Sequence, residues 1–300
     1  MRQFDYFKPD SYEKAFALLK TPGKKVMVIA GGTDVIPHTR DGAWQPDAVV
    51  DIKYLPGMRS IEIVQIDPSC GCIPGECLFV GAAVRMNEIK QAELLIPHWL
   101  LLQQAAGAMG NEQVRNRATI GGNICTASPA ADIAPALLTM DAKVLIRSAA
   151  GDRCLDIQRF FVSPKVNALQ SGEIVVGLLI PKPAVAAYGH FEKLSRRKAG
   201  DLSIVSTAVL ALRTDTGIQW RLALGAVAPT PIRAYESERI LNQSVDVQAI
   251  DQAAASAYGC CCPISDIRSS IEYRQAMVVN ITRRAIQAVL AKINGGSNDS

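Results

Sequence analysis

The chain has 300 residues, a net charge of +4, 49% hydrophobic residues and 20% charged residues. This composition is typical of a folded globular protein and excludes a largely disordered one. The small positive excess is scattered and is not interleaved with aromatic residues, which argues against a nucleic-acid-binding protein. Only three histidines are present, His38, His98 and His190, so we expect neither a histidine-rich metal site nor a catalytic triad.

The apolar stretches are too short for membrane insertion. Each is interrupted within about a dozen residues, whereas a membrane helix needs about 20 apolar residues in a row. The N-terminal residues Met1 to Tyr6 lack the apolar segment of a signal peptide. We therefore expect a cytoplasmic protein whose eight cysteines are thiols or ligands rather than disulfides.

The first part of the chain predicts a small βαβ-like lobe that ends near residue 57. Ser11 is a good N-cap for a helix over Tyr12–Lys20. The segments Lys25–Ala30 and Asp47–Ile52 are short, apolar and partly β-branched, which indicates two buried strands.

A second lobe is expected from residue 58 onward. Its predicted strands and helices are, in chain order, the strands Ile61–Ile66 and Leu78–Ala83, the helices Pro97–Ala106 and Ala131–Met140, and the strands Lys143–Arg147 and Ile174–Ile180. Pro181 and Pro183 would interrupt any sheet ladder, so this segment marks a domain boundary.

The last third of the chain predicts a second domain of strands followed by helices. Strands are predicted over Phe191–Leu194, Ile204–Leu212 and Ile218–Val227. Ser269 and Glu272 form a capping-box pattern that opens a long closing helix, whose apolar positions continue to Ile293. The expected domains are residues 1–180, with lobes of about 1–57 and 58–180, and residues 184–294.

Two pairs of adjacent glycines are candidate ligand-binding turns. Gly31 and Gly32 follow the strand that ends at Ala30, and Gly121 and Gly122 follow an apolar position. Without a Cβ atom, such residues let the backbone approach a ligand and leave amide N–H groups for an anion. Two such turns can grip a diphosphate from both sides, although a single pair is more commonly a plain tight turn. Neither pair has the spacing of a Rossmann fingerprint or a Walker loop.

Around these glycines the sequence resembles a known family. AGGTD at 30–34 and QVRNRATIGGNICTASPAAD at 113–132 are similar to the FAD-binding subunit of the molybdenum hydroxylases, the xanthine dehydrogenase and carbon monoxide dehydrogenase family. APTPIR at 228–233 and ISDIRSSIEYR at 264–274 resemble the C-terminal domain of that family. The resemblance implies an α+β fold, with a two-lobed FAD-binding domain of the vanillyl-alcohol-oxidase/PCMH type before a C-terminal domain of antiparallel sheet plus helices.

The resemblance also implies which residues bind FAD. They are Val28, Ile29, Ala30, Gly31, Gly32, Thr33, Asp34 and Val35 in a first loop, Thr119, Ile120, Gly121, Gly122 and Asn123 in a second, and the single positions Asp132, Val175 and Lys193. From the residues alone, Asp132 is equally well interpreted as a helix N-cap, and Lys193 as a solvated strand charge. No residue is expected to act as a catalytic acid or base, and no metal site is expected.

The function implied by the resemblance is that of an oxidoreductase subunit within a heterotrimer. A molybdenum-cofactor large subunit would oxidise the substrate, a small 2Fe-2S subunit would carry the electrons, and FAD on this chain would pass them to an acceptor such as NAD. A xanthine dehydrogenase type is favoured. The alternatives are carbon monoxide, nicotinate or aromatic-thioester enzymes of the same family, a self-contained FAD oxidase or dehydrogenase, and a non-catalytic accessory protein.

The cysteines depart from the pattern of the family. Cys70, Cys72 and Cys77 supply enough thiols for part of a metal site, but plain loop thiols are the favoured interpretation. The three consecutive cysteines at 260–262 are interpreted as core or surface thiols. Cys125 is expected beside the FAD, where it would fill space as a small apolar side chain.

Overall fold

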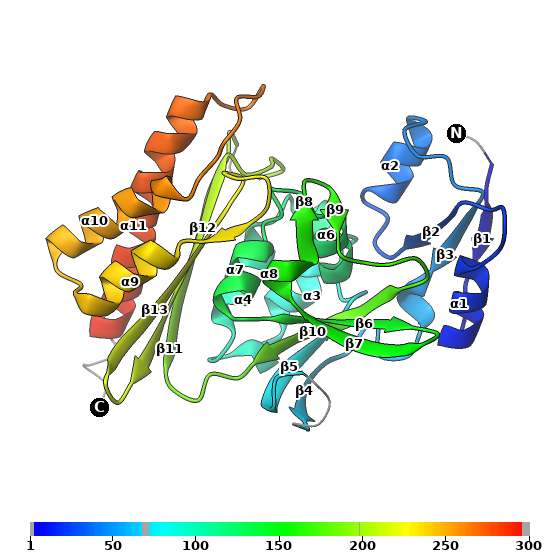
Figure 1. Cartoon of the computed structure of the whole chain (residues 1–300), viewed down its shortest axis with the longest axis horizontal. Coiled ribbons are helices and arrows are strands. Elements are labelled where there is room, and N and C mark those ends of the chain that lie inside the picture. The colour runs from blue at the N-terminus through cyan, green and yellow to red at the C-terminus, as the bar shows by residue number, and fades with distance from the viewer. Residues whose placement is uncertain (1–2, 68–71, 198, 296–300) are drawn as a thin grey trace.

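The computed structural model describes residues 3–67, 72–197 and 199–295. The described chain forms an N-terminal lobe, a central lobe and a C-terminal domain, which follow one another along the longest axis of the molecule (Figure 1). Helices and mostly antiparallel sheets alternate, so the fold is α+β as expected.

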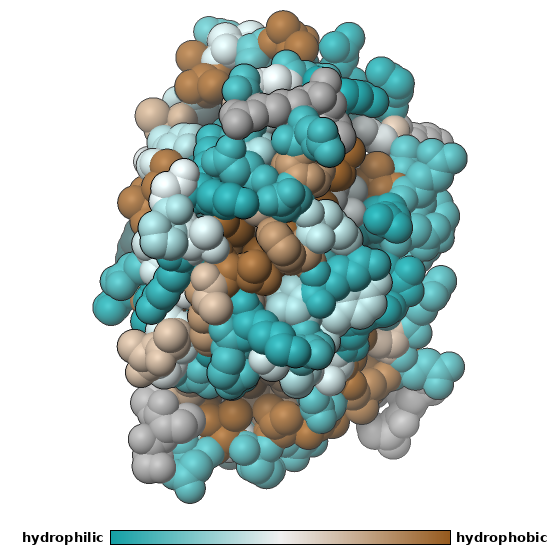
Figure 2. Space-filling view, turned by 90° about the vertical axis from the view of Figure 1, so that its right-hand side faces the viewer, coloured by the Kyte–Doolittle hydropathy of each residue, from teal (hydrophilic) through white to brown (hydrophobic). Residues whose placement is uncertain are grey.

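The N-terminal lobe is built on a parallel sheet of the order β1–β3–β2. Its elements are β1 (Asp5–Phe7), α1 (Tyr12–Leu19), β2 (Val26–Ile29), α2 (Val35–Arg40) and β3 (Ala48–Asp51). The central strand β3 is buried at every position, which explains its apolar sequence. The βαβ-like prediction is thus confirmed, although β1 and α2 were too short to be predicted. Figure 2 shows the molecule from the side of this lobe, where the surface is largely polar with apolar residues near the middle.

The central lobe is built on an antiparallel sheet of the order β4–β5–β10–β6–β7. Its strands are β4 (Ile61–Ile66), β5 (Gly75–Gly81), β6 (Lys143–Ser148), β7 (Gly151–Asp156) and β10 (Ile174–Pro181), with a hairpin of β8 (Phe161–Ser163) and β9 (Val166–Asn167). Its helices are α3 (Met86–Gln91), α4 (Leu100–Ala108), α5 (Glu112–Arg115), α6 (Ile120–Thr126), α7 (Ala134–Thr139) and α8 (Ile157–Phe160).

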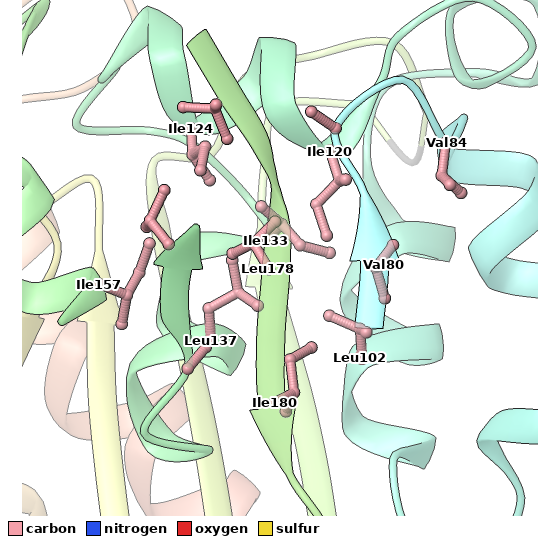
Figure 3. Packing of buried hydrophobic residues seen from close by; sticks show 14 of the residues in the cluster. Val80, Val84, Leu102, Ile120, Ile124, Ile133, Leu137, Ile157, Leu178 and Ile180 are labelled. Atoms are coloured by element: carbon pink, nitrogen blue, oxygen red, sulfur yellow. The ribbon is translucent and has the colours of Figure 1, made fainter. Parts of the chain in front are cut away.

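Apolar side chains from α6 and the sheet lock this lobe together. Ile120 and Ile124 point from α6 into the same core as Leu178 and Ile180 of β10, and all four are fully buried (Figure 3). Burial of such a side chain contributes about 1.5–3 kcal/mol. Helix α6 is therefore held rigidly by one face, and its other face is left for contacts outside this core.

A disulfide between Cys72 and Cys154 overturns the expectation that the cysteines are thiols or ligands rather than disulfides. The two Cα atoms lie 5.6 Å apart although 82 residues separate them in the sequence. Cys72 precedes β5 and Cys154 lies in β7, which β10 and β6 separate from β5 in the sheet, so this contact was not predictable from the local pattern. Cys77 is buried in β5, and Cys70 lies outside the described residues. Within the described ranges, no group of three or more His, Cys, Asp or Glu residues is placed to hold a metal ion.

The C-terminal domain is an antiparallel sheet of the order β11–β12–β13–β14, covered by helices. Its elements are β11 (Ala187–Leu194), β12 (Val205–Thr214), β13 (Gly217–Gly225), β14 (Ile232–Arg233), α9 (Tyr235–Gln243), α10 (Val247–Gly259) and α11 (Ile271–Gly295). The predicted closing helix is present, but Ser270 rather than Ser269 accepts the capping hydrogen bond from the amide of Tyr273, at 3.2 Å.

Strand β12 joins this domain to the central lobe because both of its faces are buried. Val205, Val209 and Ala211 enter the core shared with the C-terminal helices, whereas Ala208 and Leu210 enter the core of the central lobe. This alternation follows from the two-residue repeat of a strand. Helices α9, α10 and α11 lie on the outer side of the sheet, and α4 and α7 on the inner side (Figure 1). No helix in the described part of the chain combines the length and apolar character needed to span a membrane.

Candidate functional site

A cavity of about 220 Å³ opens between the N-terminal and central lobes. Three segments form its walls: the turn between β2 and α2, the glycine-bearing face of α6, and the start of β10. Most of the lining is apolar, with Val28, Ile52 and Val175 on opposite sides. A mostly apolar cavity with a few polar groups is the usual form of a cofactor site.

The turn after β2 contributes unpaired backbone donors to this cavity. No described group accepts a hydrogen bond from the amides of Gly31, Gly32 or Thr33, all three of which line the cavity. The turn is held from behind, because the ammonium of Lys53 donates to the carbonyl oxygen of Ala30 at 2.9 Å. Adjacent N–H groups on a fixed turn form a binding site for an anion.

The second glycine pair is the first turn of a helix rather than a turn after a strand. The Thr119 hydroxyl caps α6 by accepting from the amide of Gly122 at 3.1 Å. The amides of Ile120, Gly121 and Asn123 donate to the carbonyls of Val84, Ala82 and Thr119 respectively. The expectation of two matching anion-binding turns is therefore wrong, because only the first turn has unpaired amides.

Lys53 is part of a charged cluster beneath the first turn. Its ammonium lies 2.7 Å from a carboxylate oxygen of Asp51, which is fully buried, and the Tyr6 hydroxyl donates to the same carboxylate. Burial and the neighbouring carboxylate raise the pKa of Tyr6 to about 12, so the phenol stays protonated near neutral pH.

Asp132 and Lys193 form a buried ion pair outside the cavity lining. The Lys193 ammonium lies 2.7 Å from Asp132 Oδ2 and also donates to the carbonyl of Ala108 at 3.2 Å. Ser203 donates its hydroxyl proton to Asp132 Oδ1 at 2.5 Å. Burial raises the pKa of Asp132, whereas Lys193 and Ser203 act in the opposite direction. Neither alternative interpretation holds: Asp132 caps no helix, and only 9% of the Lys193 side chain is exposed.

Asn123 of α6 lies near the residues that contact Lys193. Its amide nitrogen lies 3.9 Å from the sulfur of Met109, which is adjacent to the Ala108 carbonyl that Lys193 contacts. Its Oδ1 atom is buried and receives no hydrogen bond from any described group. A buried acceptor without a donor costs about 1–3 kcal/mol, so a ligand N–H or O–H at this position would relieve a real penalty.

The structure gathers most of the residues singled out in the sequence at the cavity. These are Val28, Ala30, Gly31, Gly32, Thr33, Asp34, Val35, Thr119, Gly121, Gly122 and Val175. Ile29 and Ile120 are instead buried in the interior, because successive strand residues and the inner helix face point away from the cavity. Asn123, Asp132 and Lys193 do not line this cavity.

Several lining residues were missed because nothing in the local sequence distinguishes them from ordinary packing residues. They are Met27, Trp44, Ile52, Ala82, Thr126, Leu169, Glu173 and Ile174. Thr126 carries a specific contact, since its hydroxyl lies 2.6 Å from Asp34 Oδ2 across the lobe boundary. Cys125 lines the cavity, and burial raises the pKa of its thiol to about 12, so it stays an inert neutral group.

Two family models account for nearly the whole chain. The family described as the FAD binding domain in molybdopterin dehydrogenase matches residues 2–183, and the CO dehydrogenase flavoprotein C-terminal domain matches residues 190–289. The chain belongs to this family of FAD-binding oxidoreductase subunits of the molybdenum hydroxylases, and its cofactor is FAD.

The relatives agree with this assignment. The medium chain of carbon monoxide dehydrogenase from Hydrogenophaga pseudoflava is 29% identical, over 97% of this chain and 98% of the relative. The xanthine dehydrogenase FAD-binding subunit of Escherichia coli O157:H7 is 31% identical, over 95% and 97%. The solved H. pseudoflava carbon monoxide dehydrogenase superimposes with a TM-score of 0.88 at 29% identity, covering 97% of this chain and 98% of that one. The quinoline 2-oxidoreductase of Pseudomonas putida 86 gives a TM-score of 0.85 at 27% identity, covering 96% and 97%.

Proposed function

We propose that this chain holds FAD along α6, with the diphosphate at the turn Gly31–Thr33 and the flavin on the side of Asn123 and Lys193. The observation that carries this proposal is the set of unpaired amides of that turn, which line a cavity between the lobes. The buried acceptor of Asn123 is a second feature that suits a ligand with N–H or O–H groups. The residues present therefore fit the cofactor of the family.

Each group has a distinct task in this proposal. The amides of Gly31, Gly32 and Thr33 donate to the diphosphate oxygens, while Val28 and Val175 exclude water from the cavity. Lys193 lies at the flavin end, where its ammonium forms the buried ion pair with Asp132. A fixed cation there stabilises negative charge on a reduced ligand. Bound FAD supplies the redox chemistry, which side chains of this type cannot perform.

We also propose the division into residues 1–180, with lobes of about 1–57 and 58–180, and residues 184–294. The two matched family regions meet between residues 183 and 190, which supports this boundary. The separate apolar core beneath α9, α10 and α11 supports it as well.

The assembly that we propose is a heterotrimer with a molybdenum-cofactor large subunit and a small 2Fe-2S subunit. The names of the relatives, a medium chain and an FAD-binding subunit, support a chain that works beside other subunits. We propose a xanthine dehydrogenase type that passes electrons to NAD, supported by the 31% identity with the E. coli subunit.

Absorption spectroscopy of the purified complex tests both the presence of FAD and the xanthine dehydrogenase assignment. FAD should be present, should be reduced when xanthine is added, and should be reoxidised by NAD. Reduction by carbon monoxide or nicotinate, but not by xanthine, would overturn the xanthine assignment while leaving the FAD site intact. Full flavin occupancy in Gly122→Val protein would overturn the proposed FAD site, because a branched side chain at that cavity position blocks the cofactor.

The cytoplasm is our proposed location, although disulfides are rare in that reducing compartment and the chain contains the Cys72–Cys154 disulfide. Immunoblotting of separated cell fractions tests the location. We expect the chain in the cytoplasmic fraction, and its recovery from another fraction would contradict the proposal.

A further inference from the structure

The segment ISDIRSSIEYR at 264–274 ends in an arginine to which the proposed FAD site gives no role. Arg274 lies near the start of α11, and its side chain is only 2% exposed. One of its terminal nitrogens lies 2.9 Å from a carboxylate oxygen of Asp266, which Arg268 also pairs. A buried ion pair is seldom more stabilising than well-packed apolar side chains of similar size, so stability alone does not account for a charged group at this depth.

The other terminal nitrogen of Arg274 joins the ends of two strands. It donates to the carbonyl oxygen of Ile204 at 2.6 Å and to that of Ala226 at 3.0 Å. Ile204 immediately precedes β12, and Ala226 immediately follows β13. Ala226 has a φ of +64°, a conformation that a residue with a Cβ atom keeps only where its surroundings enforce it. The guanidinium therefore fixes the two strand ends against each other.

The first of these strand ends leads to both members of the Asp132–Lys193 pair. The residue before Ile204 is Ser203, whose hydroxyl donates to Asp132 Oδ1 at 2.5 Å. The amide of Ile204 donates at 2.8 Å to the carbonyl of Leu194, which directly follows Lys193. A shift of Ile204 would therefore move the Ser203 hydroxyl and the backbone that carries the ammonium.

The second strand end leads to the same pair from another side. The amide of Ala226 donates at 2.7 Å to the carbonyl of Pro129, three residues before Asp132. Through single backbone hydrogen bonds, Arg274 thus holds the segments that carry Asp132, Lys193 and Ser203. Its own described contacts include neither Asp132 nor Lys193, so any effect of Arg274 on the pair passes through the backbone.

We propose that Arg274 is a positioning residue that sets the place of the Lys193 ammonium at the flavin by fixing Ser203 and the segment before Asp132. This inference rests on the proposed function, in which Lys193 lies at the flavin end of the FAD site. A cation stabilises the charge of a reduced ligand only where the fold holds it in a fixed place. Arg274 supplies that fixation from the C-terminal domain, on an element that does not line the cavity.

Chemical labelling of the full chain without FAD tests the position of the pair. Acetic anhydride acylates accessible lysines, and peptide mass spectrometry gives the rate at Lys193 relative to that at Lys14, whose side chain is 65% exposed. In Arg274→Met protein we expect Lys193 to react about tenfold faster, as for the loss of one hydrogen bond to a charged group. Arg274→Lys protein keeps a charge beside Asp266 but lacks the fork of donors, so a smaller increase is expected.

Arg233 provides a matched control. Its side chain is 11% exposed, and its described partners are Glu238 in the same domain and Asp141. Arg233→Met protein should lose stability but label Lys193 at the wild-type rate. An equal increase in the Arg233 and Arg274 variants would overturn the proposal, because it would show a general loss of stability.

Wild-type labelling of Lys193 in both Arg274 variants would overturn the proposal as well. If Arg274→Met protein does not fold, Arg274→Lys protein decides by the same criterion.

The midpoint potential of FAD in the purified complex is the second readout. It should become more negative in Arg274→Met protein, because a displaced ammonium stabilises the reduced flavin less, and should stay unchanged in Arg233→Met protein. A wild-type potential in Arg274→Met protein would overturn the link between Arg274 and the flavin. Absence of FAD from the wild-type complex would overturn the proposed function instead and would leave the labelling result standing, so the two failures are distinguishable.

Discussion

A Cβ atom at Gly31 would lie 2.1 Å from the carbonyl oxygen of Arg117, a residue of the other lobe. Gly121 stands in the same relation to Ala82, because a Cβ atom at Gly121 would lie 2.6 Å from the Cβ of that alanine. Gly32 has a φ of +78°, which glycine adopts without strain, and a Cβ at Gly122 would closely approach only the Thr119 hydroxyl. All four glycines line the cavity, but in each pair only the first, Gly31 or Gly121, is also required for close packing against another segment.

Because the two kinds of glycine have different neighbours, substitutions at them should separate an effect on the stability of the fold from an effect on FAD binding. Gly31→Ala should push the lobes apart, because the obstacle is backbone rather than a flexible side chain, and we expect a loss of about 2–4 kcal/mol in stability together with loss of FAD. Gly122→Ala should keep the apo fold, since alanine favours a helix, and should weaken FAD binding only. Thermal unfolding without FAD measures the stability of the fold, and the shift on adding FAD measures cofactor binding. A Gly31→Ala protein as stable as the wild type would contradict the packing role.

The sequence indicated the location of the site better than its chemistry. The glycine pairs were visible because glycine is rare beside such apolar runs, and both lie at the cavity. The sequence did not show why glycine is needed at Gly31 and Gly121, because Arg117 and Ala82 come close to them only in the folded structure. For the same reason, local sequence could not show that the amides of α6 are already paired with Val84 and Ala82.

Elements were predicted well where a periodic apolar pattern was long. The predicted strand Ile174–Ile180 and the helix that continues through Ile293 are both present, although the strand also includes Pro181, which was expected to interrupt the sheet. Contacts between segments distant in sequence were not predictable, and the Cys72–Cys154 disulfide is the clearest example. The role of Ser203 is another, because its partner Asp132 lies 71 residues earlier in the chain.

Ser203 should stabilise the Asp132–Lys193 pair. Its removal in Ser203→Ala protein takes one of two side-chain donors from a buried carboxylate, with an expected cost of about 1–3 kcal/mol. If the pair lies at the flavin, the midpoint potential of bound FAD should shift as well. Ser206→Ala is the matched control, since the Ser206 hydroxyl is buried without a described partner and its loss should cost little. Equal effects of the two substitutions would contradict this role.

Lys53 should stabilise the fold and also hold the turn Gly31–Thr33 in place for FAD binding. Lys53→Met leaves the fully buried carboxylate of Asp51 without its cation, for which the expected cost is about 3–5 kcal/mol. The Ala30 carbonyl also loses its donor, so the turn should bind FAD less tightly. Urea unfolding and flavin titration measure the two effects. Lys53→Met combined with Asp51→Asn should recover part of the stability, and no recovery would contradict a charge-based cause.

Glu88 should contribute to stability in a pH-dependent way. Burial opposes its ionisation, but hydrogen bonds from the side chain and amide of Arg85 outweigh burial and lower the pKa of Glu88 to about 2. Because the pKa is lower in the folded state than in the unfolded chain, this stability is present above about pH 4.5 and is lost as the pH falls toward 2. The side chain is 31% exposed and that of Arg85 is 43% exposed, so solvent screening limits the contribution to about 1 kcal/mol.

Urea unfolding of Glu88→Gln protein at pH 7 and pH 3 checks this contribution. The substitution should lower stability at pH 7 and have a smaller effect at pH 3, where the wild-type pair is already weakened. Glu236→Gln is the control, because Glu236 and Arg239 form a similar pair that is more than half exposed and therefore well screened. An equal loss at both pH values in the Glu88 variant would show that packing, rather than the charge of Glu88, stabilises the start of α3.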